Sequence, residues 1–396
     1  MPGSCVRIAL YTIFRCTNYG AVLQAYALAR TLRAICGDGN VDVINHRMDP
    51  RDTHLLGKIT NPNTPWFQRW RNRRKFAARH YRPDLFESRR AKTIRIIADY
   101  IRPTEKLYTV PRELRGLPPY ATVVVGSDQV WNPILNRDFG HNPYLGGTFP
   151  EAQDRVAYAA SFGVSAIPEA CREEYKATLS RFRTITVREE SGAAICRNLL
   201  PAQGDGPLVV LDPTLLLTAE DWRGVLGDSS ADVAGRSMAA YWVRTVTGED
   251  IAALERLAEA TGVPIRLMSA GPLPKLDFPD GVVPYVEADP FDFVRTISNA
   301  ESVVTDSFHG LQFATLFRRP FLALGDIDGA MSNASRLVDF CRRYGLSGGI
   351  QDIGAFRRLE GHPFADFRTF DSGVLSDSRD RSLLALGEML PKGGGS

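Results

Sequence analysis

Several features that would define a protein class at once are missing from this sequence. No apolar run approaches the roughly 18 residues that a membrane-spanning helix needs, and the opening MPGSCVRIALYTIF lacks a small-residue cleavage site. The six cysteines are scattered without a C-x-x-C pair, which argues against a disulfide framework or a zinc site. These absences favour a soluble cytoplasmic protein with reduced thiols and no zinc site.

The sequence also lacks an excess of charge of one sign, because its 48 basic residues are nearly balanced by 45 acidic ones. A net charge of +3 on 396 residues names no polyanionic partner, and no nucleic-acid-binding signature accompanies it. With 44% hydrophobic residues the chain can bury one or two substantial cores.

Short β-rich apolar runs alternate with stretches of helical period along most of the chain. This pattern is typical of parallel sheets covered by helices, so the fold class is α/β. The predicted strands of the first series are 6–11, 41–45, 122–125, 156–161 and 184–187; a second series begins near Leu208 and includes 239–243, 265–268, 282–286, 302–305 and 321–324.

A Pro- and Gly-containing segment, PAQGDGP at 201–207, separates the two series and has the composition of a linker. We therefore expect two Rossmann-like domains that face a cleft, with ligands at the carboxyl ends of the strands. The predicted parts are 1–202 with a basic helical insertion at about 48–118, 203–370, a helix at 371–391 that returns to the first domain, and a flexible tail or cloning remnant at 392–396.

The insertion departs from the average composition. Between Trp66 and Arg102 there are twelve Lys or Arg against three acidic residues, with seven aromatic residues among them. Three interpretations stay open: a solvated pair of helices, a lid over an anionic acceptor, or peripheral contact with the inner face of an anionic membrane.

Polar residues follow several predicted strands. After the first strand, Asn18 and Gly20 open a helix whose amino end could hold an anion, or Asn18 could simply cap it. Neither a dinucleotide fingerprint nor a P-loop is present there. After the third strand, VVVGSDQVWNP offers Asp128 as a general base, or as a turn cap. Its neighbours are candidates for acceptor binding by hydrogen bonds or stacking: Gln129, Trp131 and Asn132.

Two further strand ends carry groups suited to an anion. Arg188 in TITVREES can hold a carboxylate or phosphate with two parallel hydrogen bonds, or form a surface pair with glutamate. In TDSFHG, His309 lies at a predicted helix start, where it can donate to a phosphate or serve structurally. Arg336 could face the same cleft. The segment LDPTLLL, by contrast, favours a turn at Asp212.

Taken in order, six strings resemble the polysaccharide pyruvyl transferase family: NYGAVLQAYAL, VVGSDQVWNP, YAASFG, VREE, LDPTLLL and SFHGLQFA followed by PF. The resemblance extends from about Ile8 to Leu346. It implies a fold similar to GT-B glycosyltransferases and transfer of a carboxyethylidene (pyruvyl ketal) group from phosphoenolpyruvate to a sugar or polysaccharide precursor. No cofactor or metal is implied, and the acceptor could be a sugar, a nucleotide sugar or a lipid-linked glycan.

The same resemblance implies roles for individual residues. Arg188 would bind phosphoenolpyruvate, and His309 would bind the donor and act as acid. Some family members have R-L-H at this place, whereas this chain has S-F-H with Ser307. Either Arg336 or Arg15 then replaces the missing charge, or the donor differs. The predicted donor site comprises Arg188, Asn18, Gly20, Ser307, Gly310 and Arg336. A nucleotide-sugar glycosyltransferase and a noncatalytic carbohydrate-binding protein remain alternatives.

Overall fold

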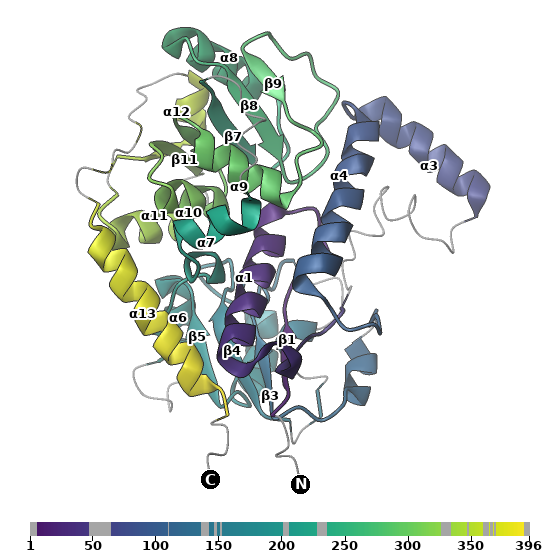
Figure 1. The fold of residues 1–396 in the computed structure, drawn as a ribbon, viewed down its shortest axis with the longest axis vertical. Coiled ribbons are helices and arrows are strands. Elements are labelled where there is room, and N and C mark those ends of the chain that lie inside the picture. The colour runs from purple at the N-terminus through teal and green to yellow at the C-terminus, as the bar shows by residue number, and fades with distance from the viewer. Residues whose placement is uncertain are drawn as a thin grey trace.

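The structure is a computed structural model of the 396-residue chain (Figure 1). It describes residues 6–46, 65–109, 111–135, 142–145, 149–150, 153–200, 206–227, 236–325, 334–346, 348–358, 364, 367 and 370–391. Most of the predicted linker at 201–207 and the tail at 392–396 lie outside the described residues. Within the described ranges, no helix has both the length and the apolar character needed to span a membrane.

The first sheet has six parallel strands in the order β2-β1-β3-β4-β5-β6. Its strands are β1 (Ile8–Tyr11), β2 (Val41–Val43), β3 (Thr122–Val125), β4 (Arg155–Ala160), β5 (Thr184–Val187) and β6 (Leu208–Val209). All five strands predicted for the first series are present. The sixth, β6, pairs with β5, so Leu208 belongs to the first sheet and not to the second series of strands.

The second sheet also has six parallel strands, in the order β12-β11-β10-β7-β8-β9. Its strands are β7 (Met238–Trp242), β8 (Ile265–Ser269), β9 (Val282–Pro284), β10 (Val303–Thr305), β11 (Phe321–Gly325) and β12 (Ile350–Asp352). Counted within the domain, this is the 3-2-1-4-5-6 order of Rossmann sheets. The prediction of two doubly wound α/β sheets is therefore confirmed.

Helices connect the strands and cover the sheets. They are α1 (Tyr19–Cys36), α5 (Arg172–Leu179), α6 (Glu190–Leu199), α7 (Ala219–Leu226), α8 (Gly248–Thr261), α9 (Pro290–Asn299), α10 (Phe308–Leu316), α11 (Ala334–Arg343) and α12 (Ile353–Arg358). Asn18 caps α1 by accepting a hydrogen bond from the Gly20 amide, and Thr247 and Asp250 form a capping box at α8. These caps satisfy amides that a helix start leaves free.

Residues alternate between the two faces of each sheet. In β1, Ile8 and Leu10 belong to one apolar cluster and Ala9 and Tyr11 to another, as the two-residue period of a strand requires. The cluster that contains Ile8 and Leu10 also contains Ala239 and Tyr241 of β7. A single apolar layer therefore continues from one sheet to the other.

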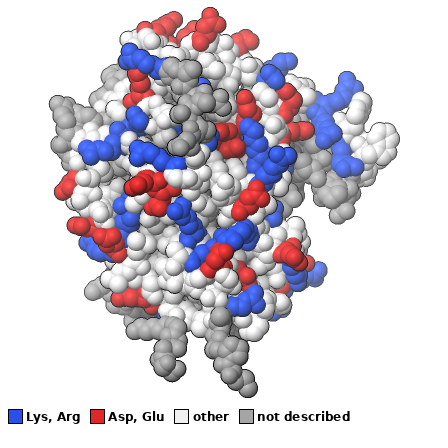
Figure 2. Space-filling view, viewed as in Figure 1, with Lys and Arg blue, Asp and Glu red and all other residues white. Residues whose placement is uncertain are grey.

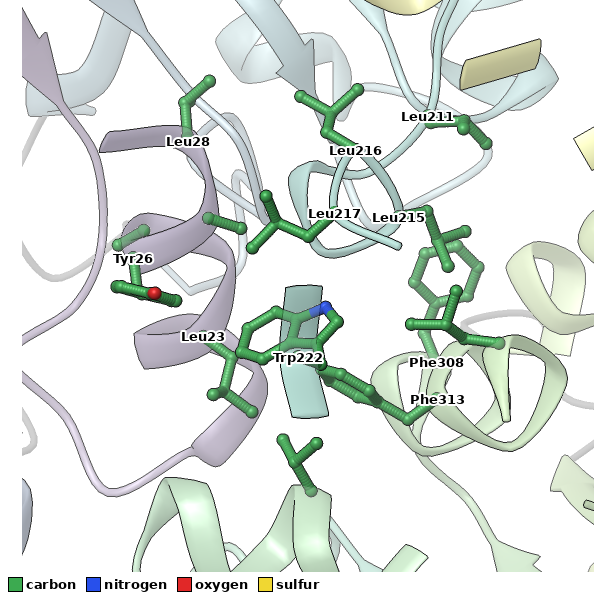
Figure 3. Packing of buried hydrophobic residues seen from close by; sticks show 14 of the residues in the cluster. Leu23, Tyr26, Leu28, Leu211, Leu215, Leu216, Leu217, Trp222, Phe308 and Phe313 are labelled. Carbon is green, nitrogen blue, oxygen red and sulfur yellow. The ribbon is translucent and has the colours of Figure 1, made fainter. Parts of the chain in front are cut away.

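This layer is filled by aromatic and leucine side chains from both halves (Figure 3). Trp222 of α7 is fully buried between α1 and α10, and its ring centroid lies 5.6 Å from that of Tyr26 and 5.1 Å from that of Phe313. The Trp222 Nε1–H donates to the Thr214 carbonyl, so the ring is buried without an unsatisfied donor.

The insertion after β2 forms α3 (Trp66–Arg79), α4 (Pro83–Ile96) and a π-helical turn η3 (Ile97–Ile101). Although these helices precede β3 of the first sheet, Phe76 and Phe86 pack in the core of the second sheet. The buried Arg89 of α4 donates to the carbonyls of Thr17, Ser269 and Ala270. The α4 helix therefore ties the loop before α1 to the end of β8.

The last helix, α13 (Ser372–Met389), runs from the second half down to the first (Figure 1). The Ser382 hydroxyl accepts from the Leu211 amide at 3.0 Å, and Arg183 donates to the Met389 carbonyl at 2.8 Å.

Candidate active site

Four polar residues follow strands of the two sheets. Asp128, Arg188 and Asp212 follow β3, β5 and β6, and His309 follows β10. The carboxyl ends of the strands in both sheets are directed at the junction between them, so the topology brings these groups together.

Arg188 is the centre of the cluster, and its side chain is fully buried. Its Nη1 donates to Asp212 Oδ2 at 2.7 Å and its Nη2 to Asp128 Oδ1 at 3.2 Å. Its Nε lies 3.4 Å from Glu189 Oε2. Burial lowers the pKa of Arg188, but the three carboxylates outweigh it and raise that pKa above its usual value. Arg188 is therefore a permanent cation held in a carboxylate cage.

Asp212 is shared between Arg188 and His309. Its Oδ2 accepts from Arg188 and lies 3.4 Å from His309 Nε2, while its Oδ1 accepts from the amide and the hydroxyl of Thr214. Burial raises the pKa of Asp212, but the neighbouring His309, Arg188 and the Thr214 amide bring it well below its usual value. Asp212 is thus a carboxylate that contacts both Arg188 and His309.

Asp212 is the residue that sequence reasoning missed. The turn predicted at this place exists, because Asp212 caps the short helix η9 (Pro213–Leu215). The same side chain also reaches Arg188 with its second oxygen. An aspartate after a strand that neighbours the VREE strand was the signal that could have found it.

His309 lies at the start of α10 and is buried. Its ring lies against the backbone of Gly20 in α1, where a Cβ would come within 2.1 Å of His309 Nδ1. The sequence pattern predicts that Gly20 lets an anion approach the helix start. In the structure, the absence of a side chain at Gly20 makes room for the imidazole.

Ser307 and Gly310 shape the turn that carries His309. The Ser307 hydroxyl accepts from the Gly310 amide at 3.2 Å and so caps α10. A Cβ on Gly310 would lie 2.5 Å from the Thr305 hydroxyl oxygen. Both residues hold the turn in place next to the site.

A cavity of about 240 Å³ opens beside Arg188. Its wall includes Arg188, Glu189 and Asp212 from the first half and Phe308 and Arg336 from the second. The guanidinium carbons of Arg188 and Arg336 lie 4.9 Å and 5.8 Å from the Phe308 ring centroid, close enough for cation–π attraction. The wall also includes Arg342 and Arg343, so four arginines border one cavity of a size suited to a small anion.

Arg336 has surroundings unlike those of Arg188. Burial and the neighbouring Arg188 charge lower the pKa of Arg336 to about 10, although three carboxylates oppose this shift. The side chain stays charged at neutral pH, and an additional anion beside it would be favourable. Arg15, the other candidate replacement cation, donates from its Nε to Asn45 and is not part of the cavity wall.

Three buried polar atoms at this junction make no hydrogen bond within the described part of the chain: Arg188 Nε, Glu189 Oε2 and His309 Nε2. Each of them still faces a group of opposite charge or an acceptor, because Arg188 Nε lies 3.4 Å from Glu189 Oε2 and His309 Nε2 lies 3.4 Å from Asp212 Oδ2. Over the same described residues, no three His, Cys, Asp or Glu side chains are arranged to hold a metal ion.

The predicted acceptor residues do not face this cavity. Trp131 is fully buried beside Phe162 and Phe182, and its indole N–H donates to the Tyr144 carbonyl. A ring with no exposed surface cannot stack on a sugar, so this expectation needs correction.

Asn132 and Gln129 hydrogen-bond to each other at 2.6 Å, and the Asn132 oxygen accepts from the amides of Ile134 and Leu135. Both side chains also lie against Gly163. Their contacts stabilise the turn after Asp128, and of this segment only Asp128 reaches the arginine cluster.

The two parallel six-stranded sheets define a GT-B-like fold, and the chain is similar in fold to solved structures. A Staphylococcus aureus MnaA–UDP structure superposes with a TM-score of 0.51 at 10% identity, over 98% of this chain and 99% of that one. UDP-GlcNAc 2-epimerase of Methanocaldococcus jannaschii has a TM-score of 0.47 at 12% identity, over 96% of this chain and 99% of that one. The calicheamicin glycosyltransferase CalG4 has a TM-score of 0.42 at 12% identity, over 98% of this chain and 96% of that one.

The family follows from the sequence. The family model of polysaccharide pyruvyl transferases matches residues 18–327, which is most of the chain. The chain therefore belongs to the polysaccharide pyruvyl transferase family. A search of curated proteins gave no significant match.

Proposed function

We propose that this protein transfers a pyruvyl ketal from phosphoenolpyruvate to two hydroxyls of a sugar-containing acceptor. Family membership supports the class of reaction. The observation that carries the proposal is that Arg188 and His309, from opposite halves, meet at one oxygen of Asp212 beside a cavity bordered by a second arginine.

The donor carries a phosphate and a carboxylate on one enol carbon. Because three carboxylates already surround Arg188, we assign the main contact with the anionic donor to Arg336, with Arg188 adding charge behind it. Arg336 then takes the place of the arginine that Ser307 replaces in this chain. Two preorganised cations would stabilise the charge that moves to the leaving phosphate.

The reaction needs one proton on the methylene carbon and one on the departing phosphate. We assign the donor of protons to His309, whose Nε2 lies 3.4 Å from Asp212 Oδ2. The first hydroxyl oxygen bonds to the enol carbon as the double bond takes up a proton. The bond to phosphate then breaks and the second hydroxyl adds, so the two hydroxyl protons end on the methyl group and on phosphate.

Asp128 is the proposed base for the attacking hydroxyls. Its side chain is 12% exposed, whereas that of Asp212 is fully buried. Asp212 is also a weak base, since its neighbours depress its pKa. A positioned acid or base contributes about 100- to 10,000-fold to a rate.

The test incubates the full chain with phosphoenolpyruvate, or with nucleotide sugars, and a panel of sugar, nucleotide-sugar and lipid-linked acceptors. Phosphate release with a product heavier by the carboxyethylidene group supports the proposal. Nucleoside diphosphate release identifies a glycosyltransferase, and donor binding without turnover on any acceptor identifies a binding protein; either result overturns it.

Two variants then test the roles. His309→Ala should abolish turnover while donor binding persists. Arg336→Gln should raise the donor concentration needed by about tenfold or more, because a charge-assisted hydrogen bond contributes about 1.5–3 kcal/mol. Arg181→Gln, an exposed arginine outside the cavity wall, is the matched control. An unchanged donor response in Arg336→Gln would remove that residue from the donor site.

A further inference from the structure

Helix α3 is the most strongly charged element of the described chain, and the proposed reaction does not use it. Its 14 residues, WFQRWRNRRKFAAR, include six basic side chains and no acidic one. Only Asn72 and Phe76 of this helix are buried. The helix projects from the body beyond α4, and its basic side chains cover this corner of the surface (Figures 1 and 2).

The first turn of α3 also exposes three large aromatic side chains. Trp66, Phe67 and Trp70 are 75%, 54% and 56% exposed. Residues 66 and 67 lie four and three positions before 70, so the three rings share one side of the helix. By contrast, the tryptophans at 131, 222 and 242 have no exposed surface. The aromatic tip is therefore a specific feature of α3.

Basic side chains accompany this aromatic tip. Arg71, Arg74 and Lys75 are exposed, and the Arg74 guanidinium carbon lies 4.9 Å from the Trp70 ring centroid. Tryptophan rings favour the boundary between lipid headgroups and acyl chains, and arginine binds phosphate with geometric fit. Aromatic rings and cations on one short helix are the composition of an element that lies in a membrane interface.

The other end of α3 is firmly held. Phe76 packs against Phe86 of α4, with ring centroids 6.1 Å apart, in the core of the second sheet. The Tyr81 amide donates to the Leu273 carbonyl, and the Lys275 amide donates to the Arg79 carbonyl. The aromatic tip is thus presented on a fixed base, and binding to a flat surface would need no rearrangement of the core.

We propose that the tip of α3, formed by Trp66, Phe67, Trp70, Arg71, Arg74 and Lys75, is a docking surface for an anionic phospholipid bilayer. The aromatic rings insert at the headgroup level and the cations pair with lipid phosphates. This surface is separate from the cavity beside Arg188, so the proposal does not depend on the proposed reaction.

The first test is co-sedimentation of the full chain with phosphatidylcholine vesicles, with and without phosphatidylglycerol. Binding should require the anionic lipid and weaken as salt increases. Because each basic residue near an anionic surface adds about fivefold to binding, Arg71→Gln/Arg74→Gln/Lys75→Gln should lose on the order of a hundredfold. The triple variant Trp66→Ala/Phe67→Ala/Trp70→Ala should also lose binding.

A matched control changes an exposed apolar residue and an exposed arginine elsewhere. Leu384 of α13 is 63% exposed, and Leu384→Ala/Arg181→Gln should bind as the unaltered protein does. All variants replace exposed side chains, and their thermal unfolding should match that of the parent.

The second test uses the tryptophans themselves, because Trp66 and Trp70 are the exposed pair among five in the chain. Vesicles with brominated acyl chains should quench part of the tryptophan fluorescence. In Trp66→Phe/Trp70→Phe that quenching should vanish while sedimentation persists, since phenylalanine keeps the apolar contact.

Equal sedimentation of the parent and both α3 triple variants would overturn the proposal, as would absence of quenching in the parent. Competition between single-stranded RNA and vesicles tests whether the surface binds nucleic acid instead. If RNA displaces the protein from vesicles and binds more tightly than they do, the surface is a nucleic-acid site and the proposal fails.

Discussion

Replacing Gly20 by alanine tests the tightest contact of the candidate active site. A Cβ at this position would lie 2.1 Å from His309 Nδ1 and 2.3 Å from its Cγ, whereas ordinary contact begins at 3.4 Å. The imidazole therefore has to retreat by about 1.3 Å, and a displacement of about 1 Å in a catalytic group can cost about 100-fold in rate. We expect turnover of phosphoenolpyruvate to fall by that order.

The stability change should be much smaller than the loss of activity. Alanine is better than glycine within a helix by about 1 kcal/mol, and overpacking costs about 1–3 kcal/mol. The free energy of unfolding should thus fall by no more than about 2 kcal/mol. Gly224→Ala is the control, because Gly224 lies in α7 and its Cβ would meet nothing within 4 Å.

Two measurements decide this prediction. One is the rate of phosphate release, and the other is the NMR signal of the His309 ring, assigned by its loss in His309→Ala. The chain has six histidines, which keeps that spectrum simple. Wild-type turnover and an unshifted His309 signal in Gly20→Ala would refute the contact between α1 and the imidazole.

Three further predictions concern buried charges. Asp212→Asn should lower the free energy of unfolding at pH 7 by about 2 kcal/mol, which is less than the loss when a buried ion pair is fully broken. Because the pKa of Asp212 is depressed, the difference in stability from wild type should shrink only in acid. A pH-independent difference in urea unfolding would contradict this. Arg89→Met should cost about 3–5 kcal/mol, since three carbonyls lose a charged donor, and a thermal unfolding midpoint equal to wild type would refute it. Burial raises the pKa of Asp306 to about 6 despite its hydrogen bonds from two amides, so wild type should lose stability relative to Asp306→Asn as pH rises from about 4 to about 6; parallel stability curves would show that Asp306 is ordinary.

The strand pattern was readable from the sequence because most strands here are apolar on both faces. The segments at 122–125 and 303–305 are fully buried and stand out against their polar flanks. One strand escaped prediction, β12, which has three half-buried residues. The strand expected near Leu208, β6, was assigned to the wrong sheet, and it has only one exposed and one half-buried residue. Neither run is long or apolar enough to show a period.

The candidate site was predictable at positions where a charged or titratable side chain follows a strand. Arg188 and His309 follow strands at the domain junction, and the structure brings them to one carboxylate. Trp131 failed as an acceptor residue because a tryptophan after a strand is equally suited to packing, and burial depends on segments distant in the sequence. Asp212 was passed over because its local capping role sufficed to explain it.

The apolar layer shared by the two sheets bears on how this protein can be divided. Trp222 and its neighbours contact both α1 and α10. Either half expressed alone would therefore expose a large apolar surface to water. A chimera that takes one half from a relative would therefore need a matching apolar surface around the Trp222 indole. The two halves of this chain therefore depend on each other for a complete core.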